Sequence, residues 1–94
     1  MANIKSAKKR IELERKATLR NRAGRSRART AVRRFREALA AGDRAQAELK
    51  LRQAIAVLDR VAQKGILHPN AAARRKSRIT RAFNDFLKRN AEAS

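Results

Sequence analysis

Residues that interrupt helices are scarce in this chain and cluster at two places. The 94 residues include three glycines and one proline, and the rest is rich in Ala, Arg, Leu, Lys, Glu and Gln, which favour helix. Gly42 suits the left-handed position after a helix, and Asp43 can cap the next helix. Gly65 is a second stop, followed by Pro69, which cannot continue a helix, and by Asn70, a candidate N-cap. These breaks predict an all-α fold with helices at about residues 5–41, 44–64 and 70–90.

Apolar residues recur along each predicted helix at the spacing of one helical face. On a wheel of about 100° per residue, the apolar set of the first helix lies within about 120°. We therefore expect three apolar stripes to pack as a small three-helix bundle. The predicted core residues are Ala28, Ala31, Val32, Phe35, Ala38 and Leu39 in the first helix, Ala47, Leu51, Ala54, Ile55, Leu58, Val61 and Ala62 in the second, and Ile79, Phe83, Phe86 and Leu87 in the third.

The first predicted helix is too long for the second to cover. At about 1.5 Å per residue it is on the order of 55 Å long, against about 30 Å for the second. Its N-terminal half continues the apolar stripe only through Leu13, Ala17 and Gly24. We predict that this half extends beyond the bundle and is frayed or disordered until it meets a partner. The tail from Ala91 to Ser94 is also expected to be disordered.

Basic side chains greatly outnumber acidic ones. The chain has 26 Lys and Arg against 8 Asp and Glu, a formal net charge of +18, so a compact form repels itself unless an anionic partner offsets the charge. Residues 15–36 contain no acidic side chain at all. Solvated helical faces normally mix signs. The pattern therefore favours a phosphate-binding surface over a merely solvated face.

Arginines form two edges along the first helix. One edge spans about 80° of the wheel and contains Arg15, Arg22, Arg25, Arg29, Arg33 and Arg36. The other edge contains Lys16, Arg20, Arg27 and Arg34, and the third helix carries a similar set, Arg74, Arg78, Arg81 and Lys88, beside Ser77. A guanidinium can bind phosphate oxygens bidentately, and small hydroxyls such as that of Ser26 often donate to phosphate or sugar oxygens. Two basic edges can contact two strands of a nucleic acid.

The aromatic content indicates how such a surface would bind. The three phenylalanines lie on core stripes, and there is no Trp or Tyr, whereas single-strand RNA modules stack bases on exposed aromatic rings. We expect shape-directed binding to folded RNA through phosphates and 2′-hydroxyls, with few base contacts. Gly24, inside a helix at a cost of about 1 kcal/mol, is interpreted as permitting close approach of an RNA backbone or, less favoured, as a tolerated neutral site.

Residues for catalysis or metal binding are not arranged in any recognisable pattern. His68 is the only imidazole, and we interpret it as a surface or packing histidine. The eight carboxylates lack ligand spacing, and there is no Cys, so we expect no enzymatic activity, no cofactor, no metal and no small-molecule substrate. No apolar run approaches the roughly 20 residues that cross a bilayer. We therefore expect a soluble, cytoplasmic chain without a signal peptide.

Three segments resemble a known family. The opening MANIKSAKKR, the stretch RTAVRRFREALAAGD and the segment KGILHPNAAARRKSRI are together similar, in order and spacing, to protein twenty of the bacterial small ribosomal subunit. The resemblance implies a three-helix bundle with an extended first helix, early direct binding to small-subunit (16S) ribosomal RNA, and a place low in the body of the particle where RNA segments converge. The family's basic opening maps to Lys5, Lys8, Lys9 and Arg10, and its second basic cluster maps to Arg74, Arg75, Lys76, Ser77 and Arg78. Residues from Ile11 to Arg29 match in character more than in identity.

Taken together, the residues and the resemblance predict one RNA-binding helical domain over residues 1–94. We expect a structural constituent of the small ribosomal subunit that stabilises folded ribosomal RNA during assembly, is associated with the ribosome and no membrane, and is a monomer outside the particle. The predicted RNA-binding residues are Lys5, Lys8, Lys9, Arg10, Arg15, Lys16, Arg22, Arg25, Ser26, Arg29, Arg33, Arg36, Arg74, Arg75, Lys76, Ser77, Arg78 and Arg81.

Two other classes of protein share the basic composition. A DNA-architectural protein would be expected to show a dimer interface or an apolar wedge, whereas the apolar stripes here are fully used by the predicted bundle. A membrane-active cationic helix is disfavoured because its apolar face is normally broad, and residues 1–25 have weak apolar content.

Overall fold

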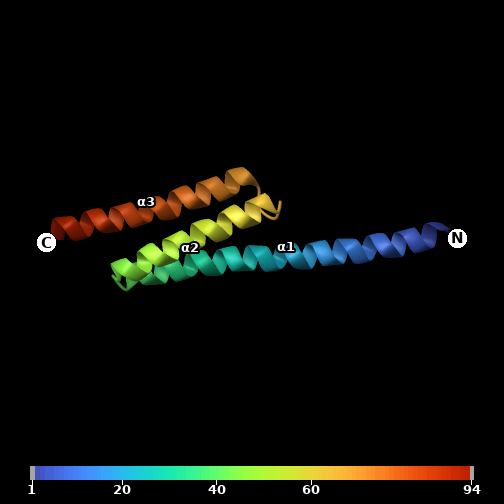
Figure 1. Cartoon of the computed structure of the whole chain (residues 1–94), viewed down its shortest axis with the longest axis horizontal. Coiled ribbons are helices and arrows are strands. Elements are labelled where there is room, and N and C mark those ends of the chain that lie inside the picture. Colours follow the sequence, from blue (N-terminus) through green and yellow to red (C-terminus); the bar gives the residue numbers. More distant parts are fainter. Residues whose placement is uncertain (1, 94) are drawn as a thin grey trace.

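The computed structural model describes residues 2–93, with the side chains of residues 7–91. Three helices follow one another: α1 (Ala2–Ala40), α2 (Arg44–Gln63) and α3 (Pro69–Ala93). Successive helices are antiparallel, and α2 packs against both α1 and α3, which contact each other least (Figure 1). The predicted all-α bundle with a long, protruding first helix is therefore confirmed.

The turn between α1 and α2 follows the prediction. Gly42 has a φ of 74°; its N–H donates to the carbonyl of Leu39 at 3.0 Å, and the N–H of Asp43 donates to that of Ala38 at 3.3 Å. The Asp43 carboxylate accepts from the N–H of Gln46 at 3.2 Å. This glycine-centred motif satisfies the last carbonyls of α1 while the aspartate caps α2. The turn thus reverses the chain within three residues.

The end of α2 is built in the same way. Gly65 also has a φ of 74°, its N–H donates to Ala62 at 3.1 Å, and the N–H of Ile66 donates to Val61 at 2.9 Å. An apolar residue after the glycine commonly packs back on the helix in this motif, and Ile66 is indeed buried in the core. Ile66 lies outside the predicted apolar stripes, so this core residue was not predicted.

The start of α3 corrects the sequence interpretation. Asn70 was expected to cap the helix, but α3 begins at Pro69. The N–H of Asn70 donates to Nδ1 of His68 at 3.1 Å, and the N–H of Ala72 donates to the His68 carbonyl at 3.0 Å. Proline suits the first helical position because its φ is already helical and no N–H is needed there. His68 therefore takes the capping role.

The core joins all three helices. The buried hydrophobic residues are Ala28, Phe35, Ala47, Leu51, Ala54, Leu58, Val61, Ile66, Ala72, Ile79 and Phe83. Phe35 of α1 meets Phe83 of α3 edge to face at 6.5 Å between ring centroids, and Phe83 lies 6.4 Å from Phe86. Every predicted stripe residue is buried or partly buried, which confirms the stripes. Ala72, like Ile66, was not predicted.

Gly24 has a packing role that neither earlier interpretation included. It is buried, and a Cβ atom at this position would lie 2.7 Å from Cδ1 and 3.1 Å from Cγ2 of Ile66, and 3.5 Å from Cγ1 of Val61. The missing side chain thus faces the protein interior, not RNA, and the position is not neutral. Glycine lets α1 approach the connection between α2 and α3.

The first part of α1 extends away from the bundle. Every residue from 7 to 16 is exposed, and Ile11, Leu13 and Leu19 are 50%, 59% and 63% exposed. We name residues 7–20 the overhang. It was expected to be frayed, yet it is helical here, as its helix-favouring composition permits. Because residues 7–16 are exposed throughout, the stability of this part is close to that of an isolated helix.

The C-terminal end of α3 also differs from the prediction. The helix continues to Ala93, so Ala91 to Ala93 are helical and not disordered, because alanine-rich sequence favours helix; Ser94 lies outside the described residues. The N-terminal end of α1 and the C-terminal end of α3 lie at opposite ends of the molecule (Figure 1). The molecule consequently measures 75 × 22 × 13 Å.

Candidate nucleic-acid interface

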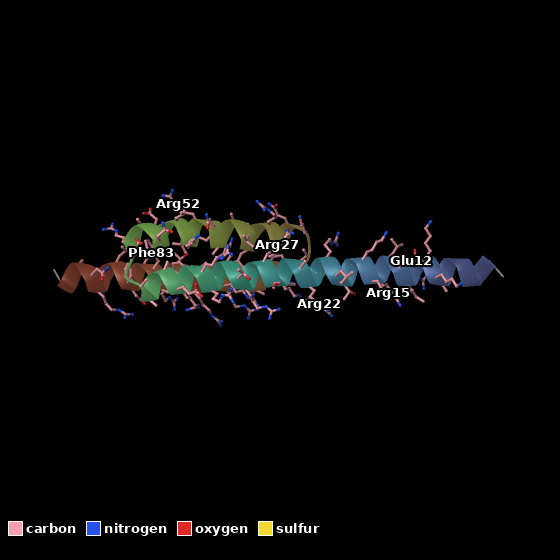
Figure 2. The ribbon with its side chains drawn as sticks, turned by 90° about the horizontal axis from the view of Figure 1, so that it is seen from below. Glu12, Arg15, Arg22, Arg27, Arg52 and Phe83 are labelled. Carbon is pink, nitrogen blue, oxygen red and sulfur yellow. The ribbon has the colours of Figure 1, made fainter. Side chains whose placement is uncertain are left out.

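Basic side chains project from both sides of α1. Figure 2 shows Arg15 and Arg22 on one side of the helix and Arg27 on the side of α2. The two sides differ in their neighbours. Arg29 and Arg36 lie next to α3, whereas Arg27 lies next to α2. The two edges predicted from the wheel thus become two different surfaces, one shared with each neighbouring helix.

The α1/α3 cleft is the more uniformly basic of these surfaces. It encloses about 240 Å³ and is lined by Arg29, Val32, Arg36, Arg75, Arg78 and Ile79. Four of these six residues are arginines, and none is acidic. A cleft lined by several arginines and no carboxylate suits an anion with several oxygens, such as a phosphate. The structure therefore brings together predicted residues that are some 40 positions apart in the sequence.

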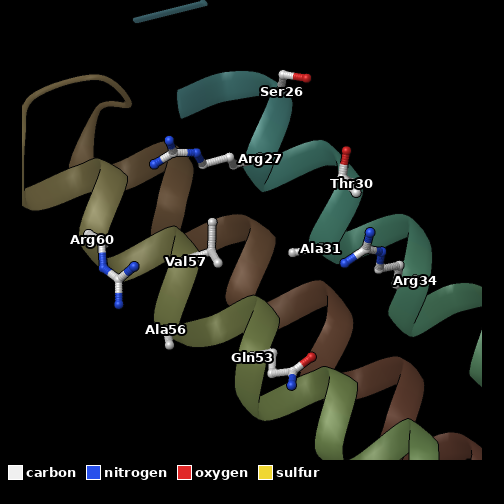
Figure 3. Close-up of a pocket in the computed structure, with 9 residues that line it drawn as sticks. All are labelled: Ser26, Arg27, Thr30, Ala31, Arg34, Gln53, Ala56, Val57 and Arg60. Atoms are coloured by element: carbon white, nitrogen blue, oxygen red, sulfur yellow. The ribbon is translucent and has the colours of Figure 1, made fainter. Parts of the chain in front are cut away.

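The α1/α2 groove is larger and more mixed. It encloses about 620 Å³ and is lined by Ser26, Arg27, Thr30, Ala31, Arg34, Gln53, Ala56, Val57 and Arg60 (Figure 3). Three arginines border a floor of small apolar side chains. Ser26 and Thr30 also line the neighbouring surface that carries Arg22, Arg29, Arg33 and Arg36. These two hydroxyl residues thus stand on the ridge between the two basic edges.

Some predicted RNA-binding residues have partners within the protein. Nζ of Lys76 lies 2.6 Å from Oδ1 of Asp59 and links α3 to α2. Nε of Arg33 lies 3.6 Å from Oε1 of Glu37 on the exposed face of α1. Nε of Arg74 donates to the carbonyl of Asn70 at 3.4 Å. Lys76 in particular has a structural role that the sequence pattern did not reveal.

The remaining predicted residues fall into three groups. Lys8, Lys9, Arg10, Arg15 and Lys16 are exposed on the overhang, and the side chain of Lys5 lies outside the described residues. Arg22 and Arg25 are exposed on α1. Ser77 and Arg81 line a shallow surface on the outer face of α3 together with Lys76, Thr80 and Asn84. The predicted set is thus spread along the molecule, and only part of it meets in the α1/α3 cleft.

Residues of α2 were missing from the predicted site. Arg60 and Gln53 border the α1/α2 groove, but α2 is the least basic helix, so charge counting directs attention away from it. Arg27 and Arg34 had been recognised as a basic edge without being assigned to the site. Only the packing of α2 against α1 reveals that these four polar residues share one groove.

Two other kinds of site find no support in the described part of the chain. No group of three or more His, Cys, Asp or Glu residues there is placed to hold a metal ion. None of the helices, as far as they are described, combines the length and apolar character needed to cross a membrane.

Comparison with known proteins identifies the family. The sequence model of ribosomal protein S20 matches residues 2–84, a range that includes the overhang and both grooves. The chain belongs to the ribosomal protein S20 family. The resemblance inferred from the three sequence segments is confirmed.

This chain aligns with relatives from different bacteria over most of the length of each relative. The small ribosomal subunit protein bS20 of Moorella thermoacetica is 55% identical over 82 residues, covering 87% of this chain and 78% of the relative. That of Desulforudis audaxviator is 54% identical over 84 residues, covering 89% and 96%. That of Corynebacterium aurimucosum is 52% identical over 84 residues, covering 89% and 97%.

Proposed function

We propose that this chain is a non-catalytic structural constituent of the small ribosomal subunit that binds small-subunit ribosomal RNA directly. It does so as one domain, through phosphate contacts from α1 and α3, and stabilises folded RNA during assembly. The observation that carries the proposal is the α1/α3 cleft, which is lined by four arginines and no acidic residue. Family membership supports the ribosomal setting, since the relatives are named as small-subunit proteins.

The mechanism is neutralisation at fixed geometry. RNA strands repel each other through their phosphates, and a cation row placed between two strands releases condensed counterions and lets them approach. The arginines of the α1/α3 cleft are held by packed helices, because Val32 and Ile79 of the same cleft belong to the apolar stripes. The overhang adds basic residues on a free rod, which can follow an RNA surface beyond the bundle.

We propose the following location, oligomeric state and ligand requirements for the protein. It acts in the cytoplasm as part of the ribosomal particle, is a monomer outside it, and takes no cofactor or small-molecule substrate. Arg22, Arg25, Arg29 and Arg36 have no hydrogen bond or ion pair within the described chain. Their guanidiniums are therefore available to an external anion.

The test is a titration of the purified protein with naked small-subunit ribosomal RNA and with duplex DNA of equal phosphate content, over a series of salt concentrations. We expect tight RNA binding that persists near physiological salt, where binding to the DNA is lost. Replacing Arg75 and Arg78 by Gln should lower the magnitude of the slope of log K against log salt by about 1.4–1.8, given roughly 0.7–0.9 per phosphate contact.

A matched control removes the same charge elsewhere. Arg52 and Arg89 are exposed and line neither groove, so their replacement by Gln should leave the slope nearly unchanged. Equal binding of RNA and DNA that vanishes at the same salt concentration would contradict the proposal. That outcome would describe a generic polycation and favour the DNA-architectural alternative.

A further inference from the structure

The two basic surfaces beside α1 differ in chemistry, not only in size. The α1/α3 cleft offers guanidiniums and apolar carbons alone. The α1/α2 groove adds a neutral polar group, the amide of Gln53; Ser26 and Thr30 border the same groove, but Figure 3 shows their hydroxyls directed away from α2. A guanidinium only donates hydrogen bonds, whereas an amide both donates and accepts them. The α1/α2 groove can therefore recognise a base edge that carries donors as well as acceptors, which the arginines of the α1/α3 cleft cannot do.

Gln53 is the group best placed for that task. It comes from α2, its side chain is exposed, and Figure 3 shows its amide directed into the groove toward α1. Within the described chain it makes no side-chain hydrogen bond. The amide therefore presents two N–H donors and one carbonyl acceptor to whatever enters.

The groove can also hold the flat face of a base. Its floor includes Ala31 and Val57, both only partly buried, and Figure 3 shows the side chains of Arg27 and Arg34 extending from α1 toward α2. Guanidinium planes stack on bases in RNA complexes. The lack of exposed aromatic rings, from which we expected few base contacts, does not exclude stacking on arginine.

We infer that the α1/α2 groove binds one unstacked nucleotide of the ribosomal RNA. The base lies on the apolar floor beside Arg27 and Arg34, the Gln53 amide hydrogen-bonds to its edge, and Arg60 contacts the adjoining phosphate. The groove volume of about 620 Å³ falls within the range of pockets for small organic ligands. This inference rests on the proposed function and assigns a different task to each surface. The α1/α3 cleft positions the RNA, and the α1/α2 groove selects a nucleotide.

The first experiment replaces Gln53 by Leu, which keeps helix propensity and removes the amide. The quantity measured is the affinity for naked small-subunit ribosomal RNA divided by that for a random-sequence RNA duplex of equal phosphate content. We expect this preference to fall about tenfold, as for loss of one base contact, with the salt slope unchanged. The control is Gln63→Leu, the same change at an exposed α2 residue outside the groove.

A second measurement locates the nucleotide. Dimethyl sulfate modifies the accessible pairing edges of adenine and cytosine and a carbodiimide reagent modifies those of uracil and guanine, so the wild-type protein should protect one unpaired base of the ribosomal RNA from one of the two reagents. Gln53→Leu should abolish that protection and Gln63→Leu should retain it. Arg34→Lys keeps the charge but removes the stacking plane, so it should lower the RNA preference severalfold at constant salt slope.

The outcomes separate this inference from the function on which it rests. If the wild type prefers ribosomal RNA and Gln53→Leu behaves like Gln63→Leu in both measurements, the nucleotide site is wrong and the proposed function stands. If the wild type shows no preference over the random duplex, both are wrong. Circular dichroism of each variant confirms that the bundle is intact, as expected for exposed positions.

Discussion

The two halves of α1 have similar composition and the same secondary structure, but they differ in what covers them. Residues 7–16 are exposed throughout, whereas Gly24, Ala28 and Phe35 are buried against the rest of the bundle. Both halves are strongly basic. Helix propensity therefore accounts for the helical conformation of the whole of α1. Burial of a few apolar side chains determines which half contributes to the stability of the fold.

The same comparison applies to binding. On the packed half, Arg27 and Arg34 face α2 and Arg29 and Arg36 face α3, so they line grooves of defined volume. Basic residues between positions 7 and 16 are exposed and provide a row of charge. We therefore expect geometric selectivity from the packed half and attraction, governed by salt, from the overhang.

The two halves should differ most in the loss of stability when a large apolar side chain is replaced by alanine. Phe35→Ala should destabilise the bundle by about 3–5 kcal/mol, the usual cost of removing a buried aromatic ring, while Leu13→Ala on the overhang should change stability by less than about 0.5 kcal/mol. Urea unfolding followed by circular dichroism measures both. Comparable losses for the two variants would show that the overhang packs on the bundle in solution.

Rates of amide hydrogen exchange should differ between the two halves of α1 in the wild-type protein. Amides of residues 8–16 in the free protein are expected to exchange roughly 100-fold faster than those of residues 28–38, because only the latter require opening of the core. Adding small-subunit ribosomal RNA should slow exchange in the overhang. Uniformly slow exchange along α1 before RNA is added would show that the overhang of the free protein is as stable as the packed half.

Gly24 lies at the boundary between the two halves of α1, and substitutions there test how closely α1 packs against Ile66. Gly24→Ala gains about 1 kcal/mol of helix propensity but places Cβ against Ile66, and overpacking costs about 1–3 kcal/mol. We expect a net loss of about 1 kcal/mol in the wild type. In an Ile66→Val background, which lacks the nearest atom, the same change should be neutral or stabilising. A cycle of the four proteins measures the coupling, and zero coupling would contradict the contact.

The smallest effect is expected at the start of α3, far from the overhang. His68→Ala removes the acceptor for the N–H of Asn70 and should cost about 0.5–1 kcal/mol. His68→Asn supplies another capping side chain and should recover most of this loss. Thermal unfolding of the three proteins provides the comparison. Equal destabilisation by Ala and Asn would mean that His68 acts through packing rather than capping.

Much of the fold could be predicted because its signals are local. The positive φ of Gly42 and Gly65, the cap at Asp43 and the period of the apolar stripes depend on neighbouring residues, and the structure confirms them. Ile66 was missed because it follows the helix stop and belongs to no stripe. Its presence after Gly65 was nevertheless a usable signal, since this turn motif commonly places an apolar residue there.

The candidate site was less predictable because it depends on contacts between helices. A wheel groups Arg27 and Arg34 but cannot show that Gln53 and Arg60 face them across a groove. It also cannot show that Lys76 pairs with Asp59. The packing role of Gly24 likewise arises from Ile66, a residue more than 40 positions away. Family membership supplied the setting, whereas pairwise packing was needed for the residues.

The elongated shape has a consequence for how an RNA is captured. The molecule is 75 Å long, many times the screening distance of about 8 Å at physiological ionic strength, so the charges at its two ends attract an RNA independently of each other. In the proposed binding mode, contact of the overhang with one RNA segment makes binding of the bundle to a second segment an intramolecular event with a high effective concentration. We therefore expect a chain of 94 residues to bind bivalently, and to gain avidity, without forming a dimer.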